Sequence, residues 1–469
     1  MKKSLLTVIA LLLIATIALT ACKTEPAPTA APAEPEVVEE PAEVVEEPEA
    51  TEAPVEEPAE VPAGLTCAEP IKIGLITDLT GILQSYGSWI VRSFMLGMEY
   101  ATGAPGTAGD VFDFAATQEN TFKIDDCEII VYVRDDSSNP ETTTTVANEL
   151  IDVQKVNFLV GTASSGATAV LQGIAQAAKV PLIVAPAAAN DITGVNFNEY
   201  TFRTSRNNYQ DAMNECIALT QNYKTFIQLA VDHAFGHGSA EAFRDACTLL
   251  GAEFVADDIF APATTTDFTP YMEQIANSGA DAYIITWAGA GFISLVQAAA
   301  DQGVTDTMEL GTTFIDNLTM PAFYSNAIGT TAGILYHYTA PKNAINDFLV
   351  AETQGRYGAS PDLFDADGMN AAIMIVETLK KTAGDVTPET LLASMEGLEF
   401  EGPKGTIYIR PEDHVAIQDM YILKLENLTD PAGDFYTFVD TTRPEPPCLL
   451  PEGLKDRCGE LPYGKLGEN

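Results

Sequence analysis

The amino-acid sequence predicts an α/β protein with two doubly wound parallel-sheet lobes, whose hinge the chain crosses more than once, preceded by a disordered tether. From residue 71 onward, short β-rich apolar runs alternate with amphipathic helical patterns, which is typical of parallel sheets covered by helices on both faces. Two such series follow one another in the chain, and this indicates two lobes. The roughly 400 residues after the tether are also long for one hydrophobic core.

Each series is predicted from hydrophobic periodicity. In the first series, strands are expected at 71–77, 129–134, 158–160 and 182–185, and helices at 89–101, 141–154 and 167–178. In the second, strands are expected at 226–231, 253–260 and 282–287, and helices at 209–221, 238–250, 268–278 and 292–302.

The last third of the chain is not expected to form a third domain. It contains a strand at 333–338, helices at 367–382 and 390–395, and an expected β-hairpin of 405–409 with 421–425. The predicted boundaries are a signal peptide (1–21), a lipid-anchored linker (22–66), lobe 1 (67–204 and 336–398), lobe 2 (205–335 and 399–447) and a disulfide-closed tail (448–469).

The N-terminus predicts export. Lys2 and Lys3 precede an apolar run over 5–19, and about 15 residues at ~1.5 Å each fall short of the ~30 Å needed to cross a bilayer. This is the pattern of a secretory signal peptide. The end of the run, 19–22, resembles the lipobox of bacterial lipoproteins, which implies that Cys22 becomes the first mature residue and carries the lipid. The alternative is an ordinary secretory signal with a chance cysteine.

The segment 23–64 holds 13 Glu and nine Pro against one Lys. Such a segment cannot bury enough apolar surface to offset its ordering entropy, so we expect it to remain disordered and extended. The net charge of the whole chain is −43. So acidic a surface repels nucleic acid and anionic lipid headgroups, and the membrane is expected as a partner only through the lipid anchor.

Six cysteines remain besides Cys22, and an even number in an exported chain favours disulfides. The predicted order of elements brings together Cys67 with Cys127, Cys216 with Cys247, and Cys448 with Cys458. The alternative is that some are free buried thiols. No cysteine and histidine spacing indicates a zinc site, and no metal or other cofactor is expected.

Two groups of residues stand where doubly wound sheets bind ligands, beyond the carboxyl ends of strands. The segment 161–166 follows a strand and opens a helix, so its backbone N–H groups and the hydroxyls of Ser164 and Ser165 could hold a small anion. Ser165 could instead merely cap the helix. The aromatic residues Tyr86, Phe235 and Trp287 occupy strand ends, or else belong to the core.

The four histidines are not accompanied by a catalytic signature. His233 and His237 are four residues apart, but the glycines around them favour a loop over a metal-binding helix face. No nucleophile elbow, phosphate-binding loop or dinucleotide fingerprint is found in the sequence. We therefore expect no enzymatic activity.

Short motifs follow one another along the chain in the segments 71–76, 79–81, 134–136, 158–161, 164–166, 180–183 and 202–205. In their order and spacing they resemble the solute-binding proteins of branched-chain amino-acid-type ABC transporters, which have the type I periplasmic-binding fold. The resemblance covers 71–427. The segments 402–406 and 410–414 resemble uncharacterised members of the same group.

The resemblance implies a set of ligand-binding positions. A hydroxyl at Ser165 and backbone at Ala187 would hold the carboxylate and ammonium of a ligand, with aromatic contacts from Tyr86 and Phe235. Ser164, Gly166, Ala189, Asn208 and Trp287 complete the expected site. Two positions depart from the amino-acid binders. Ala189 and Asn190 stand where those proteins have Thr, and the segment 311–316 lacks their Glu for the ammonium, leaving Asp316 as a substitute three residues late.

The sequence therefore predicts an extracytoplasmic receptor that captures a small polar ligand, an amino acid or a similar molecule, between two lobes and delivers it to an ABC permease. The departures allow a ligand without an ammonium group. We expect a monomer. The alternative is a ligand-sensing or regulatory module of the same fold, because fold alone does not determine function.

Overall fold

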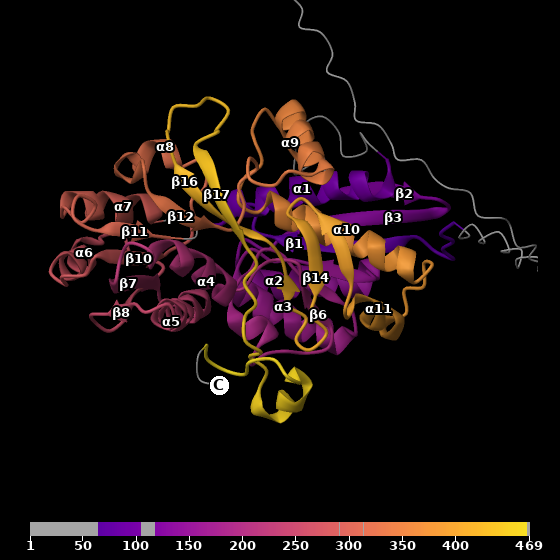
Figure 1. The fold of residues 1–469 in the computed structure, drawn as a ribbon. Coiled ribbons are helices and arrows are strands. Elements are labelled where there is room, and N and C mark those ends of the chain that lie inside the picture. Colours follow the sequence, from indigo (N-terminus) through magenta and orange to yellow (C-terminus); the bar gives the residue numbers. More distant parts are fainter. Residues whose placement is uncertain (1–63, 105–117, 290, 313, 467–469) are drawn as a thin grey trace, which may run out of the picture. The chain divides into compact units, whose positions relative to one another are not determined.

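The computed structural model describes residues 64–104, 118–289, 291–312 and 314–466 (Figure 1). The chain divides into two units, Met1–Val61 and Pro62–Asn469, and the described residues belong to the second. The expected signal peptide, Cys22 and nearly all of the linker lie outside the described residues.

The first lobe is built on a six-stranded sheet in the order β2-β3-β1-β4-β5-β6. All neighbours are parallel except β2, which forms an antiparallel edge strand beside β3. The strands are β1 (Ile71–Thr77), β2 (Glu119–Ile124), β3 (Cys127–Asp135), β4 (Phe158–Val160), β5 (Leu182–Val184) and β6 (Thr201–Arg203). The helices are α1 (Gln84–Thr102), α2 (Pro140–Glu149), its continuation η1 (Leu150–Gln154), α3 (Ser165–Ala178) and the short η2 (Asn190–Thr193).

Alternate side chains of these strands enter different cores, as the twofold repeat of a strand requires. Leu75 and Val131 belong to the hydrophobic cluster that includes α1, whereas Ile76 and Tyr132 face the cluster that includes α2 and α3. The sheet is therefore buried on both faces, which explains its nearly continuous apolar strands.

The second lobe has a parallel sheet in the order β11-β10-β7-β8, with β9 also beside β7. Its strands are β7 (Thr225–Val231), β8 (Glu253–Phe254), β9 (Ile259–Ala261), β10 (Ala282–Thr286) and β11 (Glu309–Gly311). Its helices are α4 (Asn208–Leu219), α5 (Ala234–Leu249), α6 (Thr269–Ala276), α7 (Phe292–Asp301), α8 (Met320–Phe323) and η3 (Ser325–Ala327). The single strand expected over 253–260 is two short strands.

The chain then returns twice between the lobes, as predicted. Strand β12 (Thr331–Ile334) packs against α4, and the helices α9 (Ala344–Tyr357), α10 (Asp365–Lys381) and α11 (Pro388–Met395) follow. Helix α10 lies along α1 on the first lobe (Figure 1). The remaining elements are β13 (Glu399–Gly402), β14 (Gly405–Ile409), β15 (Ala416–Ile417), β16 (Met420–Leu425), β17 (Tyr436–Thr442) and η4 (Glu452–Cys458).

The expected hairpin of 405–409 with 421–425 is wrong. Strand β14 pairs with β13 and β15, whereas β16 pairs with β12 and β17. The two strands belong to different sheets because the chain leaves the first lobe between them.

The small sheet β13-β14-β15 contacts the first lobe, although the expected boundaries assign 399–447 to the second. Strand β13 packs against α10, the ring of His414 stacks on Phe202 of β6 at 3.9 Å between centroids, and the Arg203 N–H donates to the His414 carbonyl at 3.1 Å. Strands β16 and β17, by contrast, join β12 beside α4.

All three predicted disulfides are present. The Cα atoms lie 5.1 Å apart in Cys67–Cys127, 5.0 Å in Cys216–Cys247 and 5.9 Å in Cys448–Cys458. The first joins the region before β1 to the start of β3, the second joins α4 to α5, and the third closes the tail. Across the described part of the chain, no helix combines the length and the apolar character that a membrane span needs.

Candidate ligand-binding site

A chamber of about 210 Å³ lies between the two lobes. Its walls come from the ends of β1, β4 and β5 in the first lobe and from the segments after β7, β9, β10 and β11 in the second, as expected for parallel sheets. The lining residues are Ile82, Leu83, Tyr86, Ser138, Ala163, Ser164, Ser165, Pro186, Ala187, Ala188, Arg206, His233, Phe235, Ala263, Ala288, Phe314 and Phe364.

The start of α3 supplies hydroxyls to the chamber. Ser164 is the helix cap, because its Oγ accepts from the Ala167 N–H at 3.4 Å. Ser165 is the first helical residue, and its Oγ accepts from the Ala189 N–H at 3.3 Å. The capping alternative for Ser165 is therefore wrong. Since its hydroxyl accepts from the protein, its own proton is available to a ligand, beside a helix N-terminus that favours negative charge.

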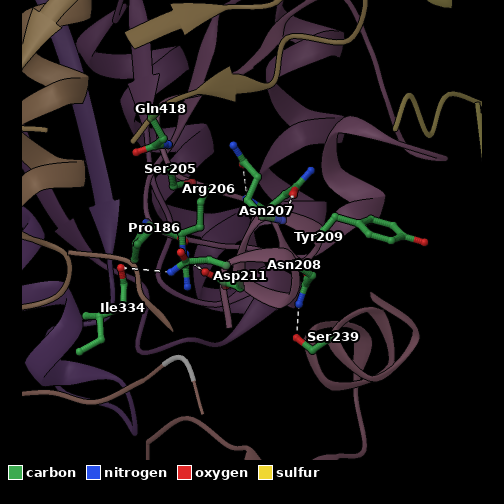
Figure 2. Close-up of polar contacts among 12 residues, drawn as sticks. Pro186, Ser205, Arg206, Asn207, Asn208, Tyr209, Asp211, Ser239, Ile334 and Gln418 are labelled. Atoms are coloured by element: carbon green, nitrogen blue, oxygen red, sulfur yellow. Dashed lines mark hydrogen bonds and ion pairs between the residues drawn. The ribbon is translucent and has the colours of Figure 1, made fainter. Parts of the chain in front are cut away.

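Arg206 brings a buried guanidinium to the chamber and was not predicted from the sequence. Its Nη1 donates to the Pro186 carbonyl at 2.6 Å and its Nε donates to Asp211 Oδ1 at 3.1 Å (Figure 2). The guanidinium carbon lies 5.4 Å from the ring centroid of Phe314 and 5.1 Å from that of Phe364. Such cation–π contacts leave the planar group fixed in orientation.

Arg206 belongs to a buried charge cluster, defined here as Arg203, Arg206, Lys404, Asp211 and Asp367. Burial raises the pKa of Asp367 to about 6 and lowers the pKa values of Lys404 to about 8 and Arg203 to about 9. Neither carboxylate oxygen of Asp367 has a hydrogen-bond partner. Arg206 is the member of this cluster that lines the chamber, and its positive charge favours an anion there.

Aromatic rings form much of the remaining wall. The ring centroid of Tyr86 lies 4.9 Å from that of Phe364 and 6.4 Å from that of Phe314, and Phe235 lies 5.4 Å from Phe314. Burial raises the pKa of Tyr86, so its phenol stays neutral.

Two glycines allow these aromatic residues to approach the strand ends. A Cβ on Gly87 would lie 1.8 Å from the Asp78 carbonyl oxygen, and one on Gly236 would lie 1.8 Å from the Val231 carbonyl oxygen. Each glycine lets its helix begin directly against the loop or strand that precedes it.

The family of periplasmic binding proteins matches residues 70–431. The chain belongs to this family. Its two lobes and the chamber between them are the solute-binding architecture of the ABC transporter proteins that it matches.

The Leu/Ile/Val-binding protein homolog 6 of Brucella melitensis is 24% identical over 386 residues, covering 80% of this chain and 92% of that protein. The crystal structure of an ABC-type branched-chain amino acid transporter from Rhodopseudomonas palustris is 34% identical, covering 80% and 96%, with a TM-score of 0.66. A solute-binding protein of R. palustris in complex with 3,4-dihydroxybenzoic acid is 26% identical, covering 80% and 97%, with a TM-score of 0.68.

The structure brings five of the expected ligand-binding residues to this chamber of the periplasmic binding fold: Tyr86, Ser164, Ser165, Ala187 and Phe235. Trp287 and Asp316 instead line a neighbouring chamber.

Gly166, Ala189 and Asn208 line neither chamber. Ala189 orients the Ser165 hydroxyl, as described above. The Asn208 side chain turns toward Ser239 (Figure 2). It also donates to the carbonyl of Phe235, a lining residue, at 3.2 Å.

Among the lining residues that were not predicted from the sequence, Arg206, Phe314 and Phe364 contribute a charge and two aromatic rings. Arg206 directly follows the segment 202–205 that carries part of the family resemblance, and that position was its only signal. Phe314 lies in the segment noted for lacking a glutamate. Within the described residues, no group of histidine, cysteine and carboxylate side chains is arranged to hold a metal ion.

Proposed function

We propose that the protein captures a small aromatic monocarboxylate between its lobes and delivers it to an ABC permease. The observation that carries the proposal is the lining of the chamber. It combines four aromatic rings, the Ser164 and Ser165 hydroxyls and the Arg206 guanidinium, with no Asp or Glu among the described lining residues. Apolar walls with a few convergent polar groups are typical of small-molecule sites.

The same lining disfavours an α-amino acid, whose ammonium group would need an anionic partner. Asp316, the expected substitute for the missing glutamate, lies in the neighbouring chamber, where its Oδ1 accepts from the Thr319 N–H at 2.8 Å and from the Thr319 hydroxyl at 2.9 Å. The relative that binds 3,4-dihydroxybenzoic acid supports a ligand that lacks an ammonium group.

The ligand's ring would pack among Tyr86, Phe235, Phe314 and Phe364, and its carboxylate would lie toward Ser165 and Arg206. Because the walls come from both lobes, a bound ligand contacts both and stabilises the closed arrangement. The permease would then receive the ligand from the closed protein. The residues take part in binding, and we assign them no catalytic step.

A thermal-shift panel tests the ligand class. Benzoate and 4-hydroxybenzoate should raise the midpoint of unfolding, whereas benzamide, benzylamine and L-leucine should not, because a ligand stabilises in proportion to RT ln(1 + [L]/Kd). Benzamide and benzylamine keep the ring but lose the negative charge. A shift with L-leucine and none with either benzoate would contradict the proposal.

We also propose that Cys22 carries a lipid and that the Glu- and Pro-rich segment tethers the lobes to a membrane. The support is the apolar run, the lipobox resemblance and the composition of 23–64. The substitution Cys22→Ala should move the protein from the membrane to the soluble extracytoplasmic fraction, as measured by cell fractionation. Undiminished membrane association of the variant would refute the anchor.

A further inference from the structure

A second chamber of about 170 Å³ adjoins the first. Both share the residues Ile82, Leu83, Tyr86 and Phe314 in their walls. The second chamber continues past these residues to Trp89, Trp287 and Phe292, and Asp316 lies in its wall. Each chamber alone is smaller than the roughly 300–1,000 Å³ typical of ligand pockets, whereas together they reach that range.

Phe314 stands between the chambers. It lies in the irregular segment between β11 and α8, is 5% exposed, and faces rings from both lobes: Tyr86 at 6.4 Å and Phe364 at 5.9 Å from the first, and Phe235 at 5.4 Å from the second. The Arg206 guanidinium covers it at 5.4 Å. Its ring therefore closes the first chamber on the side that leads to the second.

Tyr86 also lines both chambers, but its ring is held in place more firmly than that of Phe314. It lies in the first turn of α1, its centroid is 5.4 Å from that of Trp89, and the adjacent Gly87 holds the helix against the Asp78 backbone. Phe314 has no such helical support, so its ring can be removed without dismantling a helix start.

We propose that Phe314 determines the length of the ligand: its ring confines the bound carboxylate to one aromatic ring and bars longer arylalkyl carboxylates from the second chamber. The proposal rests on the proposed function, because it takes the carboxylate to be held near Ser165 and Arg206. With the ring absent, the two chambers become one elongated site that starts at Arg206 and ends near Asp316. A cationic group at the far end of a ligand would then meet a carboxylate.

The test is a calorimetric titration of benzoate and 4-phenylbutanoate into the wild-type protein, Phe314→Ala and Phe364→Ala. Wild type should bind benzoate at least about tenfold more tightly than 4-phenylbutanoate. Phe314→Ala should reverse this order by about tenfold or more, because the extra methylenes become buried. Phe364→Ala enlarges only the first chamber, so it should weaken benzoate without reversing the order.

A cationic probe checks the far end of the elongated site. In Phe314→Ala, 4-(2-aminoethyl)benzoate should bind about tenfold more tightly than in the double variant Phe314→Ala/Asp316→Asn, because the amine loses its charged partner. Phe314→Leu, which keeps an apolar side chain, should show an intermediate length preference. Unfolding midpoints of all variants establish that each is folded at the titration temperature.

The outcomes separate the two proposals. If wild type binds benzoate and folded Phe314→Ala keeps the wild-type order, the role of Phe314 is refuted and the proposed function stands. If the wild-type protein binds no aryl carboxylate, the proposed function is refuted. In that case, binding of 4-phenylbutanoate by Phe314→Ala would still support the role of Phe314. If Phe314→Ala does not bind it either, the role of Phe314 is refuted as well.

Discussion

The two serines at the start of α3 have different tasks, although they are adjacent and chemically alike. Ser164 caps the helix through the Ala167 N–H, while Ser165 is oriented by the Ala189 N–H. This division arises because the cap residue has extended backbone, which turns its side chain back to the helix, whereas the next residue is already helical. Both hydroxyls keep their own proton, and the proposed pose places the ligand carboxylate at the hydroxyl of Ser165.

Ser165→Ala should lower the affinity for an aryl carboxylate by about ten- to a hundredfold, since a hydrogen bond to a charged group contributes roughly 1.5–3 kcal/mol. The variant should also be less stable, because the buried Ala189 N–H loses its acceptor. Ser164→Ala should lose about 1 kcal/mol of stability with the helix cap and little affinity. Calorimetry and urea unfolding on both variants give the two quantities. Equal affinity losses in the two variants would contradict the assignment.

At this scale the sequence was informative where a residue type and a strand end coincided. Ser165, Tyr86 and Phe235 follow directly from that rule. Arg206 and Phe364 did not, because each reaches the chamber only through long-range packing. Arg206 is positioned by the Pro186 carbonyl, 20 residues away, and Phe364 precedes a helix that packs on α1. Neither relation has a local sequence pattern.

At the scale of elements, His337 in the segment after β12 contacts Asn317, which lies in the loop that contains Phe314 and Asp316. His337 is 3% exposed, with Nε2 3.1 Å from Asn317 Oδ1 and Nδ1 2.7 Å from the Thr339 hydroxyl. Its surroundings include the rings of Tyr338 and Tyr436, with centroids 4.7 and 4.9 Å away. Burial among such neighbours lowers its pKa to about 3.

This pKa makes stability depend on pH in a defined direction. The unfolded chain binds a proton at His337 below about pH 6.5, whereas the folded chain does so only near pH 3, so acid favours unfolding within that window. The stabilisation that comes from the depressed pKa of His337 is fully present above pH 6.5 and is lost progressively as the pH falls. Between pH 7.5 and pH 4.5 the free energy of unfolding should fall by about 2–3 kcal/mol on this account.

Replacing His337 by Gln removes the titration and keeps a polar side chain. The variant should be less stable than wild type at pH 7.5, and the difference in unfolding free energy should narrow by about 2 kcal/mol at pH 4.5. Guanidinium unfolding at the two pH values measures it. A difference that stays constant with pH would show that His337 does not titrate in this way.

Buried strands were predictable where their apolar runs are continuous. The strand at 71–77 was located with its exact ends, and the three-residue strand at 158–160 likewise. Strands β6 and β11 have the same length but were missed, because Thr201 and Arg203 in β6 and Glu309 and Gly311 in β11 interrupt the apolar pattern. The failed hairpin shows a different limit: neighbouring β-patterns were paired locally, while the chain was in fact passing between lobes.

For the molecule as a whole, the disulfides illustrate how much element order can determine. Cys67 and Cys127 could be paired because two parallel strands begin together, and Cys216 and Cys247 because their helices flank one strand. The order of elements did not predict which lobe the segment 399–417 joins. Its placement depends on packing against α10 and against β6, and β6 lies about 200 residues earlier in the sequence.

The two lobes meet around the ligand chamber through aromatic residues of both. Phe314 and Phe235 of the second lobe approach Tyr86 and Phe364 of the first. The buried charge cluster lies beside them, near the segments where the chain crosses between lobes. A ligand that combines an aromatic ring with one negative charge therefore satisfies both groups of residues at once.

The most direct test of this account is a crystal structure of the protein with 4-hydroxybenzoate. The ring should occupy the chamber between the lobes among Tyr86, Phe235, Phe314 and Phe364, with the carboxylate within hydrogen-bonding distance of the Ser165 hydroxyl or the Arg206 guanidinium. A ligand bound outside this chamber, or one with its carboxylate pointing away from both groups, would contradict it.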